Sequence, residues 1–355
     1  MTSAPRERRR SRARLTAAGG ALLCLLLFLS WLTHRPGHKP ESAKNIGDTV
    51  APVSPPVAAG PGNAAKPPSV GKPAAQMVLK YGHSPGEIGF MRGQEHEPIG
   101  PESFAVTRDG GVLIADVANH RIVLYSSTGQ YMRSLELPGV SLGDVATDRQ
   151  GRLYVYDQLR RTLQQFAPDG TAGNTLMLNS ADIDTRGYFH VSGNSVYFAD
   201  AAARDVLIGI LKEGALVAPE TSSQRTAEGI HGESGRVFAL GLNRGESLQM
   251  QIRDAAADSP THSLSVALPG IVSARFVGED QSQRIYIQTE RALDEKQIAL
   301  EVLAFSPAGE LLSTTRMPEN DYAIWTARLV DVQSDGTIVQ FLPQRDQAKL
   351  NLFTN

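Results

Sequence analysis

The chain of 355 residues is 41% hydrophobic and 20% charged, with a formal net charge of −2. This length allows two average domains or one large repeat domain, and the lack of an overall basic excess argues against a nucleic-acid-binding protein. The single cysteine, Cys24, lies in an apolar segment, so the rest of the chain has no disulfide and no thiol nucleophile or metal ligand.

The N-terminal segment has the pattern of a membrane anchor. Six arginines and one glutamate precede Leu15, and residues 15–32 (LTAAGGALLCLLLFLSWL) carry no charge. As a helix they would span about 27 Å, close to the roughly 30 Å hydrocarbon core of a bilayer. Because positive residues stay on the cytoplasmic side, we predict a cytoplasmic basic segment at 1–14 and a transmembrane signal anchor at 15–32. The protein would then be a single-pass protein of the inner membrane, with its remainder periplasmic or extracellular.

Other targeting signals compete with this interpretation. A cleaved secretory signal has a shorter apolar core followed by a small-x-small site, whereas Ser30-Trp31-Leu32 ends this segment. A lipoprotein signal would place its cysteine after the apolar run, but further apolar residues follow Cys24. Arg8-Arg9-Arg10 match a twin-arginine signal only loosely. We therefore favour an uncleaved anchor, with cleavage as the main alternative.

Residues 33–76 read as a disordered linker. The stretch from Pro36 to Gln76 contains nine prolines, many alanines and glycines, and few large apolar residues. Such a composition cannot bury enough surface to offset its ordering entropy. A flexible coil of about 40 residues spans about 35 Å. It would lift the following domain off the membrane, or it is a neutral low-complexity segment.

From residue 77 onward the chain consists of repeats of about 40 residues. Four short β-like runs separated by turns occupy Ser103–Gly139, and the next unit aligns Leu153–Asp157 with Val112–Asp116. A unit of this length with four strands is typical of a propeller blade. The last unit is one strand short, and Met77–Tyr81 (MVLKY) has no unit of its own. We predict an all-β, six-bladed β-propeller of four-stranded antiparallel blades at 77–355, closed by the strand at 77–82, because closure removes unpaired edges.

The first blade resembles the NHL-repeat family. An aspartate ends its second strand and Asn-His-Arg-Ile opens its third, at Asp116 and Asn119–Ile122, and the connector Tyr81–Phe90 echoes that of the family. In the second blade the motif has become Asp157-Gln158-Leu159-Arg160-Arg161, and later blades keep only the strand rhythm. The resemblance implies an NHL-type propeller. It also implies that a site would lie where the connections between blades and the loops between second and third strands meet. Similar propellers include a metal-dependent peptidyl-amidating lyase and calcium-dependent lactonases.

Candidate site residues fall on those loops and form two groups. The binding-face candidates are Asn119, His120, Gln158, Arg160 and Arg161 in the early blades and Arg291, Glu295, Lys296, Arg345 and Asp346 in the late ones. The second cluster lies in the long connection 82–101 and comprises His83, Glu87, Glu95, His96 and Glu97, although solvation alone explains many such charged loops. His120 is expected to have a structural role. His190 and His231 are expected near turns on the opposite face.

Two functional hypotheses follow. No zincin, Walker, nucleophile-elbow or calcium-loop motif occurs, so we assign no catalytic residue, metal or cofactor. Binding-face candidates of both signs suit protein or peptide contacts. We therefore favour a membrane-tethered scaffold, without enzymatic activity, that binds a protein, peptide or other ligand of the cell envelope and no nucleic acid. The alternative is a metal-dependent lyase or hydrolase with its site in the central channel.

Overall fold

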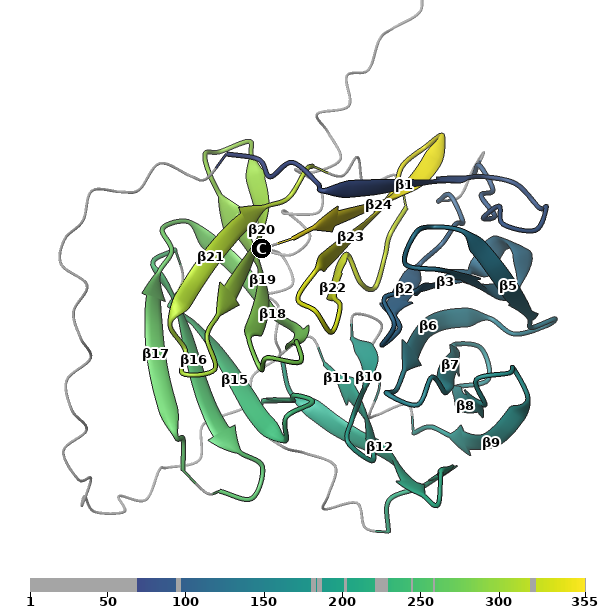
Figure 1. Ribbon diagram of the computed structural model, residues 1–355, viewed down its shortest axis with the longest axis horizontal. Coiled ribbons are helices and arrows are strands. Elements are labelled where there is room, and N and C mark those ends of the chain that lie inside the picture. The colour runs from purple at the N-terminus through teal and green to yellow at the C-terminus, as the bar shows by residue number, and fades with distance from the viewer. Residues whose placement is uncertain are drawn as a thin grey trace, which may run out of the picture. The chain divides into compact units, whose positions relative to one another are not determined.

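The computed structural model describes residues 69–93, 97–179, 183, 187–200, 203–220, 229–243, 245–257, 259–319 and 324–354. They form six four-stranded sheets arranged as blades around a common axis (Figure 1). All strand pairs within the blades are antiparallel. This confirms the predicted all-β, six-bladed architecture. The expected anchor at 15–32 lies outside the described residues. Within them, no helix is long and apolar enough to cross a membrane.

The first three blades follow one another along the chain. Blade 1 contains β2 (Ser103–Val106), β3 (Val112–Asp116), β4 (Arg121–Tyr125) and β5 (Tyr131–Glu136). Blade 2 contains β6 (Leu142–Thr147), β7 (Leu153–Asp157), β8 (Thr162–Phe166) and β9 (Ala172–Met177). Blade 3 contains β10 (Tyr188–Ser192), β11 (Ser195–Ala199), β12 (Asp205–Lys212) and β13 (Ala215–Val217). A short 3-10 helix, η1 (Val117–Asn119), joins β3 to β4.

The last three blades complete the ring. Blade 4 contains β14 (Ile230–His231), β15 (Arg236–Asn243), β16 (Ser247–Asp254) and β17 (His262–Ala267). Blade 5 contains β18 (Ile271–Glu279), β19 (Ile285–Ala292), β20 (Ile298–Phe305) and β21 (Leu311–Arg316). Blade 6 contains β22 (Val330–Val332), β23 (Ile338–Pro343), β24 (Gln347–Phe353) and β1 (Ala75–Lys80).

The ring closes between the two ends of the described chain. β1 pairs antiparallel with β24, with Met77 opposite Leu350 and Leu79 opposite Ala348. The strand alternates, so that Met77 and Leu79 are buried while Val78 is exposed. This is the strand that the sequence predicts as the closing strand of the last blade. It begins at Ala75, so the last residues of the expected linker 33–76 belong to the propeller.

Apolar contacts between neighbouring sheets hold the blades together. Phe104 of blade 1 lies against Phe341 of blade 6, with ring centroids 5.4 Å apart. Phe238 of blade 4 stacks on Phe276 of blade 5 at 4.7 Å. Burying each such side chain contributes about 1.5–3 kcal/mol. The alternating apolar residues that define the strands therefore also define the ring.

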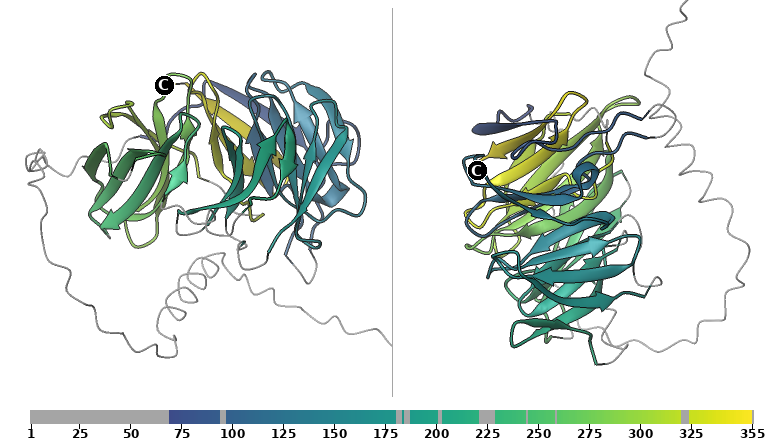
Figure 2. Two further views of the ribbon diagram at one scale, coloured as in Figure 1. Left: turned by 90° about the horizontal axis from the view of Figure 1, so that it is seen from below. Right: turned by 90° about the vertical axis from the view of Figure 1, so that its right-hand side faces the viewer.

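The strands of each blade run between two faces of the ring (Figure 2). One face, which we call the site face, carries the loops from second to third strands and the connections between blades. The other, which we call the turn face, carries the turns from first to second and from third to fourth strands.

Ring closure can be tested within β1. Replacing Leu79, which is 3% exposed, by alanine removes packing in the apolar core shared by blades 1 and 6 and is expected to lower the free energy of unfolding by about 2–5 kcal/mol. The matched control is Val78→Ala, whose side chain is 51% exposed and whose effect should stay within about 0.5 kcal/mol. Denaturant titration of both variants measures the difference. Equal stability would contradict the role of β1 as an integral strand.

Candidate functional site

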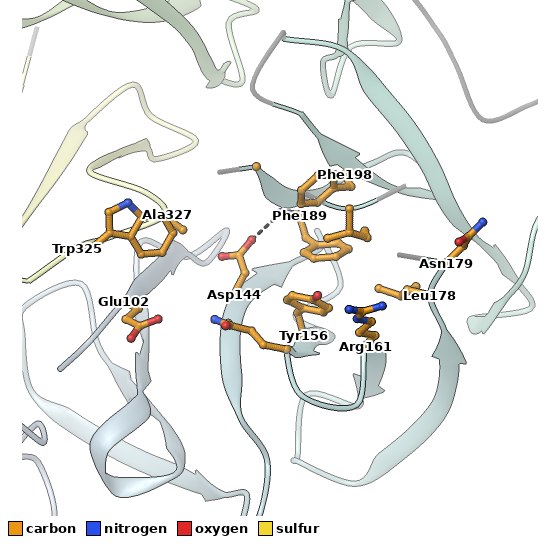
Figure 3. A pocket seen from close by; sticks show the side chains of 14 residues that line it. Glu102, Asp144, Tyr156, Arg161, Leu178, Asn179, Phe189, Phe198, Trp325 and Ala327 are labelled. Carbon is orange, nitrogen blue, oxygen red and sulfur yellow. Dashed lines mark hydrogen bonds between the residues drawn. The ribbon is translucent and has the colours of Figure 1, made fainter. Parts of the chain in front are cut away.

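A pocket of about 350 Å³ opens on the site face, and we call it the face pocket. Its walls come from blades 1, 2 and 3 and from the connection that precedes blade 6 (Figure 3). The lining residues are Glu102, Gly143, Asp144, Tyr156, Gln158, Arg161, Leu178, Asn179, Ile183, Gly187, Phe189, Phe198, Trp325 and Ala327. This size falls within the range typical of small-molecule pockets.

Aromatic side chains form one wall of the face pocket. The rings of Tyr156 and Phe189 lie 5.0 Å apart, and those of Phe189 and Phe198 lie 5.1 Å apart. Trp325 is 50% exposed at another part of the lining. Phe189 and Phe198 are almost fully buried, so the aromatic surface open to a ligand comes mainly from the half-buried Tyr156 and from Trp325. The pocket therefore suits a ligand with an apolar or aromatic part.

A buried carboxylate fixes this wall. Asp144, in the inner strand β6, is 3% exposed. It accepts hydrogen bonds from the hydroxyl of Ser103, from the backbone N–H of Val145 at 2.9 Å and from that of Phe189 at 2.6 Å. These bonds join the inner strands of blades 1, 2 and 3. Because both of its oxygens are occupied, Asp144 acts as a structural residue that positions Phe189.

Glu102 is the second carboxylate of the face pocket, and it is half-buried. Burial raises the pKa of its carboxyl group, and a hydrogen bond from Gln158 opposes this shift in part. No ion pair of Glu102 occurs within the described ranges. The backbone N–H of Ala327 donates to the Glu102 carbonyl at 2.7 Å, which brings the connection bearing Trp325 against this residue.

Arg161 supplies the positive charge of the pocket. Its backbone has a φ of 54°, close to the 53° of His120 at the corresponding position in blade 1. Asp157 holds the loop by accepting from the backbone N–H groups of Leu159 and Arg160, each at 3.0 Å. Burial raises the pKa of the Tyr156 hydroxyl, and the charge of Arg161 opposes that shift. The guanidinium of Arg161 thus lies near the aromatic wall.

The early-blade candidates divide between the pocket and the loops. Gln158 and Arg161 line the pocket. Arg160 instead donates to Asp157 at 2.7 Å and to the Gly139 carbonyl at 2.6 Å. It therefore helps to hold the loop that carries Arg161.

Asn119 and His120 lie in the NHL-like loop, outside the pocket lining. Asn119 donates to the buried Asp116 at 2.9 Å, and its amide oxygen lies 2.6 Å from Nδ1 of His83. His120 is exposed in a left-handed conformation, with Nδ1 3.3 Å from the Val140 carbonyl. These contacts tie the start of the connection 82–101 to blade 1.

The late-blade candidates stay apart from the face pocket. Arg291 forms a two-bond ion pair with Glu301, at 2.6 and 3.0 Å, and its side chain is only 11% exposed, so it is not available at the surface. Lys296, Glu295 and Arg345 are exposed. Asp346 is also exposed and lies 3.5 Å from Arg92.

The second candidate cluster, in the connection 82–101, is described only in part. Glu87 accepts from the backbone N–H of Ser84 at 3.0 Å, a bond that lowers the pKa of its carboxyl group. Glu97 is exposed, whereas Glu95 and His96 lie outside the described residues. In the part of the chain that the structure describes, no group of three or more His, Cys, Asp or Glu is placed to hold a metal ion.

His190 and His231 meet at one buried carboxylate. They lie in the inner strands β10 and β14, close to the turns from first to second strands near which the sequence places them. Nε2 of His190 is 2.8 Å and Nδ1 of His231 is 3.0 Å from the oxygens of Asp205. Burial raises the pKa of Asp205, but the charge of His190 and the hydrogen bonds from both imidazoles outweigh it, so the pKa is lowered. The cluster links blades 3 and 4.

Comparison with known proteins identifies one family. The profile of the family described as "Domain of unknown function (DUF7485)" matches residues 73–319. None of the curated proteins matches the chain significantly.

Solved structures also match. Hydrazine synthase from Kuenenia stuttgartiensis is 13% identical, with a TM-score of 0.44 over 71% of this chain and 80% of that chain. A DUF4221 family member from Bacteroides vulgatus is 10% identical, with a TM-score of 0.42 over 80% and 97%. Virginiamycin B lyase from Staphylococcus aureus is 11% identical, with a TM-score of 0.39 over 71% and 95%. At such identities the likeness concerns the fold and transfers no activity.

Ionisation of Glu102 should lower the free energy of unfolding at neutral pH. Because its pKa is raised in the folded state, the native protein keeps a proton that the unfolded chain releases as the pH rises above 4.5. The free energy of unfolding therefore falls as the pH rises from 4.5 through the raised pKa of Glu102. The variant Glu102→Gln has no carboxyl group at this position and should not show this fall. We expect a higher Tm for Glu102→Gln than for the parent protein at pH 7, and no difference below pH 4.5.

Melting curves between pH 4 and 8 measure this difference. Glu310→Gln, at an exposed carboxylate, serves as the control and should show no pH-dependent gain. A lower Tm for Glu102→Gln at pH 7 would mean that an interaction within the protein already compensates the Glu102 charge.

Proposed function

The chain belongs to the family described as "Domain of unknown function (DUF7485)", and from its site we propose that it is a membrane-tethered, extracytoplasmic propeller that binds a peptide or protein segment. The observation that carries this proposal is the face pocket, where an aromatic wall lies between Glu102 and Arg161 (Figure 3). An apolar wall supplies contact area, and polar groups at its margins fix the orientation of a ligand.

The loop between β3 and β4 supports the choice of this face. Asp116 is fully buried and pairs with Arg121 at 3.0 Å, and Arg121 also donates to the carbonyl of Glu87 at 2.9 Å. These bonds attach the loop to the connection 82–101. We propose that blades 1 and 2 are NHL-type blades whose loops hold the pocket residues, with Arg161 where blade 1 has His120.

The tether would join the propeller on the face that carries the pocket. Val70 bridges to Arg316, the last residue of β21, and the N–H of Gly71 donates to the Arg316 carbonyl at 2.7 Å. The connection that follows β21 carries Trp325 of the face pocket. We propose that the apolar segment 15–32 anchors the protein in the inner membrane.

Site-directed photo-crosslinking in intact cells tests the binding face. A photoreactive amino acid at position 159, in the loop between Gln158 and Arg161, should give crosslinks, because Leu159 is 79% exposed on the site face. Adding Trp325→Ala and Arg161→Gln should reduce them at least tenfold. The control places the same group at Gln150, which is exposed on the turn face, and should give few crosslinks. Crosslinks only from the control position would contradict the assignment of the face.

Membrane topology can be tested through cysteine labelling. In a Cys24→Ser background, Ser69→Cys should react with a membrane-impermeant maleimide in spheroplasts, because residue 69 follows the proposed anchor. Ser3→Cys should react only after the membrane is permeabilised. Labelling of Ser3→Cys in intact spheroplasts would contradict the proposed orientation. Release of the Ser69→Cys protein into the soluble fraction would show that the anchor is cleaved.

A further inference from the structure

We infer that the face pocket takes a short zwitterionic peptide, with its ammonium group at Glu102, an apolar side chain on the aromatic wall and its carboxylate at Arg161. This inference rests on the proposed binding function and names the class of ligand. It follows from two opposite charges that line one cavity and have no ion-pair partner in the part of the chain that the structure describes.

Several buried acids have arginine partners, whereas Glu102 has none among the described residues. Glu301 is paired with Arg291, and Glu279 with Arg236, through bonds of 2.5–3.0 Å. Among the described residues, the Glu102 carboxylate receives an amide hydrogen bond from Gln158 and has no arginine or lysine partner. A desolvated carboxylate without a cation is costly. A ligand ammonium group would supply the missing charge.

The surroundings of Glu102 suit a cation. Trp325 lines the same pocket, and its connection is fixed against Glu102 by the backbone bond from Ala327. In the view of Figure 3, Glu102 and Trp325 lie together at one end of the drawn site. An ammonium group gains both from a carboxylate and from the face of an indole ring. The arrangement therefore favours a cationic group over a neutral one.

Arg161 provides the complementary end. In Figure 3 it lies beyond Tyr156 and Phe189, on the side away from Glu102. Its guanidinium has five N–H donors, suited to two-bond recognition of a carboxylate. The paired loop residue Arg160 is already bound to Asp157. Arg161 is thus the guanidinium of this loop that remains for a ligand.

The size of the cavity limits the ligand. A water molecule occupies about 30 Å³ in the liquid, so a pocket of about 350 Å³ holds on the order of ten waters. This is room for a peptide of a few residues with one large side chain. A folded partner would reach the pocket only with an extended segment.

Isothermal titration calorimetry on the full-length protein in detergent tests the inference with three probes. These are the tripeptide Gly-Gly-Phe, its N-acetyl form, which lacks the ammonium group, and its C-terminal amide, which lacks the carboxylate. Each cap should weaken binding to the parent protein at least tenfold. Acetylation should make little further difference in Glu102→Gln, and amidation should make little further difference in Arg161→Gln. Arg108→Gln, on the turn face, serves as the control and should bind like the parent protein.

Several results would overturn the inference. Equal affinity for all three probes would show that the termini are not recognised. Loss of the acetylation effect in Arg161→Gln instead of Glu102→Gln would show that the orientation is reversed. If neither this tripeptide nor the corresponding di- and tetrapeptides bind, the ligand class is wrong. The crosslinks from position 159 then decide separately whether the site face binds a partner. The melting temperature of each variant shows that it is folded.

Discussion

Buried and half-buried carboxylates connect neighbouring blades at their inner strands. The innermost strand of each sheet has a neighbouring strand on one side only. The backbone N–H and C=O groups on its other side therefore have no partner in the same sheet. Asp331 of β22 accepts from the N–H of Val106 in β2 at 3.1 Å, and Asp205 accepts from the N–H of His231 in β14 at 2.6 Å. Buried N–H groups must find such partners. Apolar packing brings the blades together, and these bonds fix their relative positions at the axis.

The same constraint places the candidate site. The backbone of Phe189 is held on both sides, because its N–H donates to Asp144 at 2.6 Å and its carbonyl accepts from Arg328 at 2.7 Å. Arg328 in turn contacts Asp331 at 3.2 Å. The central aromatic ring of the face pocket is therefore attached to the network that sets the geometry of the ring. Rigid support of this kind lowers the entropy lost when a ligand binds.

The sequence predicts the blades because strand alternation and turn residues repeat locally. It also predicts the closing strand, because Met77–Tyr81 belongs to no unit of its own and the last unit is one strand short. The pocket is harder to predict. Gln158 and Arg161 could be chosen because they lie in a loop after a second strand. Tyr156 looks like any other strand residue of its blade.

The site contacts that the sequence does not predict join residues far apart along the chain. Glu102 and Trp325 are 223 positions apart in the sequence and meet in one pocket only because the ring brings blade 6 beside blade 1. Asp205 is 15 positions from His190 and 26 from His231. No local spacing indicates that the two imidazoles share it. Arg291 looks like a surface residue in sequence, but its partner Glu301 on the adjacent strand buries it.

The distribution of charge pairs separates folding from function. Asp116 and Glu301 each have an arginine partner, and removing either member would leave a buried charge. Glu102 and Arg161 have no such partner within the described residues, so the fold gains little from their charges. Natural domains retain residues that lower stability where binding needs them. The identity of these two residues is therefore better explained by an external ligand than by the stability of the propeller.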